Sequence, residues 1–258
     1  MALCALLLLG SCAPSLPGWE LVFADEFDGD RGEAPDPRWW TAATGGGGWG
    51  NEELQDYDAR NAEQDGDGHL VITADRATGG TCWYGSCAYS SARLHTSGKF
   101  SRLHGRFEAR VRVPQGRGLW SAFWMLGEGD AWPYAGEIDV MEHLGSEPDV
   151  VHGTLHGPGY SGPQGPTAST RSPGATQDFR TYAVEWEPGS VTWLVDGRAT
   201  ATFTPATLPA GARWVFDRPH HLLLNLAVGG RWPGPPDGTT PFPSRLVVDH
   251  VRVYERAG

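Results

Sequence analysis

The sequence predicts an all-β protein, built as an antiparallel two-sheet β-sandwich with jelly-roll topology. Short segments alternate between apolar and polar residues with a period of two, which is typical of half-buried strands. The 36 glycines and 20 prolines supply many turns and disfavour long helices. Because no segment of useful length has helical periodicity, the strands must bury their apolar faces against one another, as two packed sheets do.

The segment 105–113 has the clearest alternation. Phe107 and Ala109 are expected to face the core, whereas Arg106 and Glu108 are expected to face water. Comparable strands, with turn residues between them, are expected at 70–74, 181–186, 191–195, 221–226 and 246–254. Asp196-Gly197 directly follows one of these segments and is a hairpin turn signal.

The chain divides into a leader with a short tether, residues 1–18, and one domain, residues 19–258. The apolar run 2–9 is too short for a bilayer, which needs about 20 residues, and it resembles the hydrophobic part of a signal peptide. Leu9 to Cys12 resembles the lipobox of bacterial lipoproteins, in which the cysteine is lipidated. We therefore expect export to the extracellular space or cell surface, with Cys12 as the candidate lipid anchor.

Charge and composition narrow the class of partner. The formal net charge is -11 and no basic run is present, which argues against nucleic acid. A neutral partner and a monomeric protein are expected, although an acidic surface also serves solubility alone. The 12 tryptophans fit both a tryptophan-rich core and a groove of flat indoles suited to sugar rings. We expect some in each role.

Cys82 and Cys87 enclose a short loop downstream of the leader cysteines. A metal site of the usual kind would need two such pairs, and only one is present. A disulfide formed in an oxidising compartment is therefore expected, and two free thiols are the alternative.

Three acidic residues, Glu137, Asp139 and Glu142, crowd a strand that is otherwise apolar. Residues two apart on a strand share a face, so Glu137 and Asp139 should point the same way. Glu142 is out of phase by one and joins them only if a β-bulge lies near Met141. Carboxyl groups placed this close raise one another's pKa values, which is costly unless the site uses them.

This pattern has three interpretations. Two carboxyl groups about 5–5.5 Å apart are what a retaining glycosidase needs. A solvated strand and a calcium cluster are the alternatives, the second because carboxylates also suit that ion. The neighbouring Trp120, Trp124, Trp132 and Met141 argue against a solvated face, so catalysis is favoured.

The segment 136–142 resembles the signature of family-sixteen glycoside hydrolases, in the bulged form found in laminarinases. The resemblance implies a concanavalin A-like jelly roll with a substrate cleft on its concave sheet. It also implies Glu137 as nucleophile, Asp139 as its hydrogen-bonding neighbour and Glu142 as acid/base. The expected activity is endo-acting retaining hydrolysis of β-1,3-glucan, extending to mixed β-1,3-1,4-glucan, with no cofactor needed for the chemistry.

Further segments resemble the same family in the same order, at 23–29, 51–55, 91–94, 118–126, 153–156, 224–230 and 248–254. The resemblance implies that substrate is bound by Asn51, Arg93, Trp120, Trp124, Trp132, His156 and Asn225. Core packing competes for Trp124, a structural histidine for His156 and a buried amide for Asn225. Glu26 and Asp249 resemble a structural calcium site that many relatives carry on the convex face.

Two other functions fit part of this pattern. The same mechanism could act on a galactan of the agar or carrageenan type, for which a sulfated polymer would favour a basic cleft. A glucan-binding sandwich without activity is the third hypothesis. The presence of both Glu137 and Glu142 argues against it.

Overall fold

The computed structural model describes residues 16–258. The predicted lipidation site Cys12 and most of the predicted leader lie outside the described residues. Within residues 16–258, no helix is long and apolar enough to cross a bilayer. The described helices are three short 3₁₀ turns, η1 (Ala59–Asn61), η2 (Gly162–Gln164) and η3 (Pro205–Thr207).

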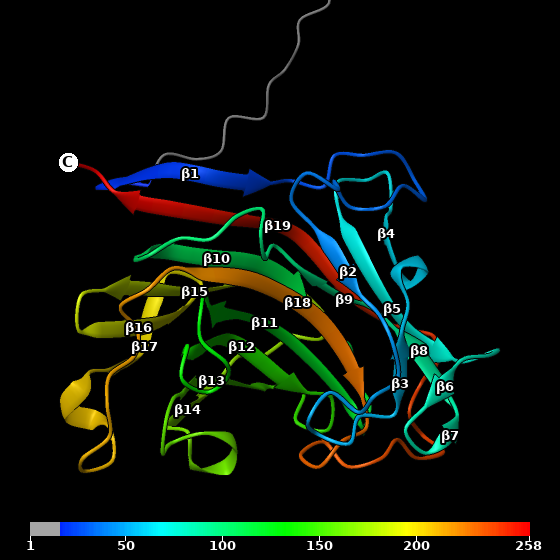
Figure 1. The fold of residues 1–258 in the computed structure, drawn as a ribbon. Helices are drawn as coiled ribbons and strands as arrows, with labels where there is room; N and C mark the ends of the chain where they lie inside the picture. The colour runs from blue at the N-terminus through cyan, green and yellow to red at the C-terminus, as the bar shows by residue number, and fades with distance from the viewer. Residues whose placement is uncertain (1–15) are drawn as a thin grey trace, which may run out of the picture.

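Two large sheets pack face to face, which confirms the predicted β-sandwich (Figure 1). The larger sheet has ten strands, in which β1 (Trp19–Asp25) pairs with β19 and β4 (Ala62–Gln64) pairs with β5. Its other strands follow the order β17 (Arg198–Phe203), β16 (Ser190–Val195), β15 (Arg180–Glu187), β10 (Gly105–Arg112), β19 (Ser244–Arg256), β5 (Leu70–Arg76), β8 (Tyr89–Ser91) and β3 (Gln55–Tyr57).

The second sheet has seven strands and carries the acidic cluster. Their order is β14 (Thr167–Arg171), β13 (Val150–His156), β12 (Glu137–Leu144), β11 (Leu119–Gly127), β18 (His220–Val228), β9 (Arg93–His95) and β2 (Thr41–Ala43). All of these pairings are antiparallel. Figure 1 shows that this sheet is curved, with its concave face turned away from β10 and β19.

The core lies between the sheets and follows the predicted period of two. Phe107 and Ala109 on β10 are fully buried, as are Phe123 on β11 and Ile138 on β12. Apolar side chains from both sheets thus fill one layer, and burial of this apolar surface stabilises the sandwich.

The prediction that Arg106 and Glu108 face water is wrong, because both side chains are buried on the outer face of the ten-stranded sheet. Arg106 Nε donates to Glu108 Oε2 at 2.9 Å, and its Nη1 donates to Glu185 Oε1 at 2.9 Å. The alternation places them on the correct face. Paired charges can nevertheless be buried there, because each compensates the desolvation of the other.

The residues predicted for a calcium site, Glu26 and Asp249, pair with basic side chains. Arg252 donates to both carboxylate oxygens of Glu26, at 2.7 and 2.8 Å. Asp249 is hydrogen-bonded to Arg110, and its Oδ1 lies 2.6 Å from His250 Nδ1. Both carboxylates pair with arginine side chains, and a structural calcium ion at these residues stays a prediction.

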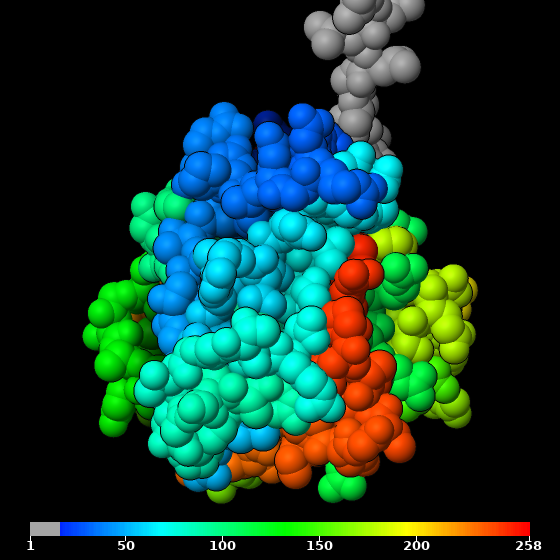
Figure 2. Space-filling view, turned by 90° about the vertical axis from the view of Figure 1, so that its right-hand side faces the viewer, coloured from blue at the N-terminus to red at the C-terminus, as the bar shows by residue number. Residues whose placement is uncertain are grey.

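The predicted disulfide between Cys82 and Cys87 is confirmed. It closes a small hairpin formed by β6 (Thr81–Cys82) and β7 (Gly85–Ser86). Figure 2 shows this part of the chain, drawn in teal, on the surface near the orange loop before β19.

Candidate active site

Strand β12 contains the β-bulge that the acidic pattern requires. On β11, Phe123 pairs with Met141 and Trp124 pairs with Asp139, so Val140 has no partner there. The register with β13 shifts over the same residues. Val140 and Met141 both join the core, and Glu142 returns to the face that Glu137 and Asp139 occupy.

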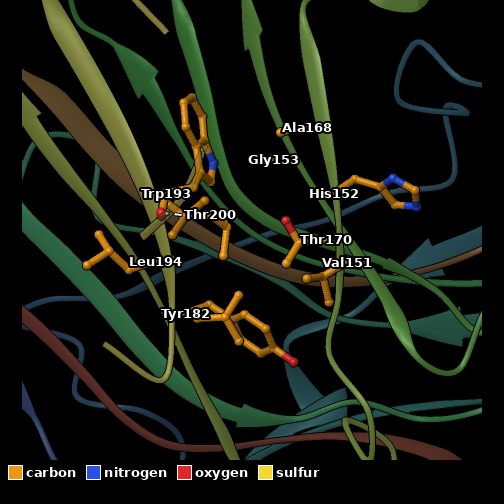
Figure 3. A pocket seen from close by; sticks show the side chains of 11 residues that line it. Val151, His152, Gly153, Ala168, Thr170, Tyr182, Trp193, Leu194 and Thr200 are labelled. Carbon is orange, nitrogen blue, oxygen red and sulfur yellow. Dashed lines mark hydrogen bonds between the residues drawn. The ribbon is translucent and has the colours of Figure 1, made fainter. Parts of the chain in front are cut away.

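Trp193 of the opposite sheet holds the bulge in place. Its indole Nε1 donates to the backbone carbonyl of Asp139 at 2.8 Å. Gly153 makes room for the indole, since a Cβ there would lie 2.2 Å from Trp193 Nε1. Figure 3 shows the small cavity that remains beside Trp193, Gly153 and Tyr182. The bulge is therefore supported from the core side by a tryptophan that only a glycine neighbour accommodates.

Each carboxyl group on β12 has its own polar partners. Trp132 Nε1 donates to Glu137 Oε2 at 2.5 Å. His156 Nε2 lies 3.1 Å from Asp139 Oδ2. One carboxylate oxygen of Glu137, one of Asp139 and one ring nitrogen of His156 all lie within 4.8 Å of one another.

Glu142 is held by two donors from neighbouring strands. Trp120 Nε1 donates to its Oε1 at 3.1 Å, and Thr154 Oγ1 donates to its Oε2 at 3.3 Å. Both carboxylate oxygens are therefore oriented by the protein. The indole and hydroxyl fix the direction in which the free edge of the carboxyl group points.

Burial raises the pKa values of all three carboxyl groups. The pKa of Glu137 rises to about 8 through burial and then the charge of Asp139. Burial also raises the pKa of Asp139 to about 7. The pKa of Glu142 is raised well above its usual value, first by burial and then by Asp139. The raised pKa of Glu142 keeps a proton on this carboxyl group, the state that a general acid requires.

Arg93, Trp124 and Asn225 form one contact group beside the acids. The Arg93 guanidinium lies against two indoles, with Cζ 4.7 Å from the Trp124 ring centroid and 4.8 Å from that of Trp49. Trp124 Nε1 donates to Asn225 Oδ1 at 2.8 Å. The Trp124 side chain is on the other face of β11 from the core-facing Phe123, so core packing does not explain why a tryptophan stands there.

Most of the predicted residues occupy consecutive strands of one sheet, whereas Asn51 and Trp132 lie in loops. His156 is on β13, the acids are on β12, Trp120 and Trp124 are on β11, Asn225 is on β18 and Arg93 is on β9. We call this set the carboxylate row. It crosses the outer face of the seven-stranded sheet, with the acids toward one end and Arg93 toward the other. Such a row suits an extended ligand that runs across the strands.

Comparison with known proteins identifies the family. Residues 51–246 match the family described as glycosyl hydrolases family 16. The chain belongs to glycoside hydrolase family 16. It is 46% identical to a β-glucanase of Rhodothermus marinus, over 92% of this chain and 86% of that protein. It is 39% identical to a glucan endo-1,3-β-glucosidase of Cryptopygus antarcticus, over 88% of this chain and 87% of that protein.

Solved structures agree with this family 16 assignment. The laminarinase catalytic domain of Thermotoga maritima superposes with a TM-score of 0.87 at 41% identity, covering 93% of this chain and 99% of that one. The laminarinase of Rhodothermus marinus gives 0.84 at 45% identity, covering 95% and 100%. The predicted jelly roll of this family is thereby confirmed.

Sequence reasoning missed several residues that contact the predicted site residues. Glu53 is buried and accepts hydrogen bonds from Gln55 Nε2 at 2.6 Å and Asn51 Nδ2 at 3.4 Å. The predicted Asn51 therefore lies beside a buried carboxyl group. Trp232 is 44% exposed and meets Trp120 edge to face, with ring centroids 5.5 Å apart. Trp232 and Trp49 stand in glycine-rich loops, which carry no periodic signal.

Proposed function

We propose that this family 16 glycoside hydrolase is an endo-acting retaining enzyme that cleaves β-1,3-glucan by double displacement. The observation that carries the proposal is the bulge in β12, which places Glu137, Asp139 and Glu142 on one face. In this proposal Glu137 is the nucleophile and Glu142 the general acid and base. Asp139 positions Glu137, and its charge helps keep Glu142 protonated.

In the first step Glu142 donates its proton to the glycosidic oxygen, while a Glu137 carboxylate oxygen attacks the anomeric carbon. The bond from that carbon to the glycosidic oxygen breaks, and the released chain leaves with a new hydroxyl group. Trp120 and Thr154 orient the Glu142 carboxyl group for this transfer. The product is a glycosyl ester on Glu137, and the negative charge that Glu137 loses is now on Glu142, which has given up its proton.

In the second step Glu142, now ionised, takes a proton from a water molecule. The hydroxide oxygen attacks the anomeric carbon from the side that the first chain vacated, and Glu137 leaves as a carboxylate. Two inversions at one carbon return the β configuration. The proton on Glu142 is restored, so the site is ready for another cycle.

Sequence relatives and charge support β-1,3-glucan as the substrate. The proteins of Rhodothermus marinus and Cryptopygus antarcticus are named for glucan cleavage, the second for the β-1,3 linkage. The net charge of -11 suits a neutral polymer. Mixed-linkage glucan is included in the proposal because an endo-1,3-1,4-β-glycanase of Rhizobium meliloti is 32% identical over 249 residues.

A sulfated galactan is a weaker candidate. A keratan-sulfate endo-1,4-β-galactosidase of Sphingobacterium multivorum is 32% identical over 252 residues. The cation of the carboxylate row, Arg93, packs against the rings of Trp49 and Trp124. One cation packed against two indoles is a small basic contribution for a sulfated polymer, and its N–H groups can donate to sugar hydroxyls.

We also propose that the protein is exported. The Cys82–Cys87 disulfide supports this, because disulfides persist in oxidising compartments. A lipid anchor on Cys12 stays a prediction from the leader sequence. Mass spectrometry of the mature protein from its native cell envelope would reveal either a lipidated or an unmodified N-terminus.

The proposed function is tested by incubating the protein with laminarin and following reducing ends and product anomers. We expect reducing-sugar release with oligosaccharides of several lengths as early products. The NMR spectrum of the first products should show the β-anomer before mutarotation. An α-anomer would contradict retention, and glucose as the sole early product would contradict endo action.

Trp132→Phe should shift the acidic limb of the pH profile of kcat/KM upward by about one pH unit. The Trp132 indole N–H stabilises ionised Glu137 and lowers its pKa, so its removal raises that pKa. The nucleophile must be ionised, and less of it is ionised at a given acidic pH. Tyr134→Phe, at an exposed aromatic on the same loop, is the control. An unchanged acidic limb in Trp132→Phe would show that this bond does not tune Glu137.

A further inference from the structure

The disulfide-closed hairpin β6–β7 carries two exposed aromatic side chains that the catalytic mechanism does not use. Trp83 is 53% exposed and Tyr84 is 38% exposed. Their ring centroids lie 5.4 Å apart in an edge-to-face arrangement. Exposed aromatic surface of this size is unfavourable in water, so its use as a binding surface needs to be considered.

The polar atoms of both side chains are already engaged within the protein. Trp83 Nε1 donates to the carbonyl of Glu53 at 2.9 Å. The Tyr84 hydroxyl donates to the carbonyl of Leu54 at 2.6 Å and accepts from the Ala88 amide at 2.9 Å. What the two residues present to solvent is therefore ring surface, held in a fixed orientation. Stacking on such pre-organised rings costs little conformational entropy.

Glycines leave this aromatic surface uncovered. A Cβ at Gly48 would lie 3.0 Å from Trp83 Cδ1, so the indole rests directly on the backbone of that loop. At Gly45, Gly47 and Gly50 an added Cβ would meet nothing within 4 Å. The loop before Asn51 thus forms a floor without side chains, apart from Trp49.

The hairpin is continuous with the carboxylate row through this same loop. Trp49 lies in it and covers the Arg93 guanidinium. Glu53 lies at its end, and the charge of Arg93 lowers the pKa of this buried carboxyl group, which burial raises. The isolated bridge between Gly46 and Cys82 joins the loop to the hairpin. The aromatic pair therefore stands beyond Arg93, at the end of the row away from the acids.

We propose that Trp83 and Tyr84 form a distal platform for a sugar ring of a long β-glucan whose scissile bond lies at Glu137 and Glu142. The inference rests on the proposed function and adds a residue pair that sets chain-length preference. A glucan long enough to span from the acids past Arg93 reaches the platform, and a short oligosaccharide does not. The Cys82–Cys87 bond fixes the hairpin, so the platform depends on the oxidised state.

The test compares kcat/KM for a series of β-1,3-gluco-oligosaccharides, from the shortest that the enzyme cleaves to laminarin. In Trp83→Ala, the ratio of kcat/KM for the longest substrate to that for the shortest should fall about tenfold, the size of one good aromatic contact. Trp19→Ala is the control, because Trp19 stacks with Arg256 on the other sheet. Its ratio should match that of the wild type.

Trp83→Phe separates stacking from anchoring of the loop. It keeps a ring but loses the hydrogen bond to Glu53, so the platform proposal expects most of the length preference to survive. A uniform loss on every substrate, in Trp83→Ala and Trp83→Phe alike, would mean that Trp83 only positions the loop at Asn51, and would overturn the platform. Circular dichroism and the melting temperature verify that each variant is folded.

The Cys82→Ser/Cys87→Ser double variant provides an independent readout. Loss of the disulfide should lower the same long-to-short ratio severalfold, because the hairpin no longer holds the two rings. An unchanged ratio in both Trp83→Ala and the double variant, with wild-type cleavage of laminarin intact, would refute the platform alone. Absence of cleavage of any β-glucan by the wild type would refute the proposed function instead.

Discussion

Glu137→Ala should lower kcat for laminarin hydrolysis by on the order of 10⁴-fold or more, the loss typical when a covalent nucleophile is removed. Without this carboxylate no glycosyl ester can form, and water has no equivalent route from that side of the sugar. The fold should survive, because Glu137 begins strand β12 on its outer face and contributes no core contact.

Azide distinguishes loss of the nucleophile from general damage to the site. In Glu137→Ala the small anion can occupy the vacated space and attack the anomeric carbon of a glycosyl fluoride substrate once. One inversion from a β-linked reactant gives an α-glycosyl azide. Glu63→Ala, at an exposed position on β4, should keep wild-type activity. A Glu137→Ala variant with near wild-type kcat, or a β-azide product, would remove Glu137 from the nucleophile role.

The period of two along the strand was sufficient to predict from the sequence which face of the sheet part of this site occupies. Glu137 and Asp139 share a face because they are two residues apart, and the core-facing Ile138 between them agrees. The alternation alone leaves Glu142 on the opposite face, and the resemblance to the bulged family 16 signature implied the bulge that returns it. Sequence could not show what supports the bulge, because Trp193 reaches it from the opposite sheet.

The parts of the site that sequence missed depend on strand order and on loops. Arg93 meets Asn225 because β9 pairs with β18, and no local pattern reports that pairing. Trp49 and Trp232 come from loops whose conformation is set by glycines. The same limit applies to the arginine partners of Glu26 and Asp249, because Arg252 and Arg110 are distant in the sequence and no local pattern reports them.

Glu142→Gln should lower kcat on laminarin by about 10²–10⁴-fold, the usual contribution of general acid–base catalysis. The amide keeps the shape and the carbonyl that accepts from Trp120, but it has no proton to donate. An aryl β-glucoside with a good leaving group needs no protonation in the first step. Its glycosylation rate, measured as the burst of released phenol, should therefore fall much less than the rate on laminarin. Equal losses on both substrates would contradict the general-acid role.

The same substitution should stabilise the protein, and increasingly so as pH rises. The folded protein raises the pKa of Glu142 above its unfolded value, so the folded state binds more protons than the unfolded state between the two pKa values. Stability is therefore fully present below the unfolded pKa and is lost as pH rises toward the folded pKa. A glutamine never ionises, so the variant does not lose this stability as the pH rises.

We expect the melting temperature of Glu142→Gln to match that of the wild type near pH 4 and to exceed it by about 2–4 °C near pH 8, corresponding to about 1–2 kcal/mol. Glu147→Gln is the control, because its partly exposed carboxylate lies beside His152, outside the acidic cluster. A difference in melting temperature between Glu142→Gln and the wild type that is constant with pH would mean that packing explains the difference. A difference that becomes smaller as the pH rises would mean that the folded protein stabilises ionised Glu142. Glu142 would then be poorly suited to hold the proton that the first step requires.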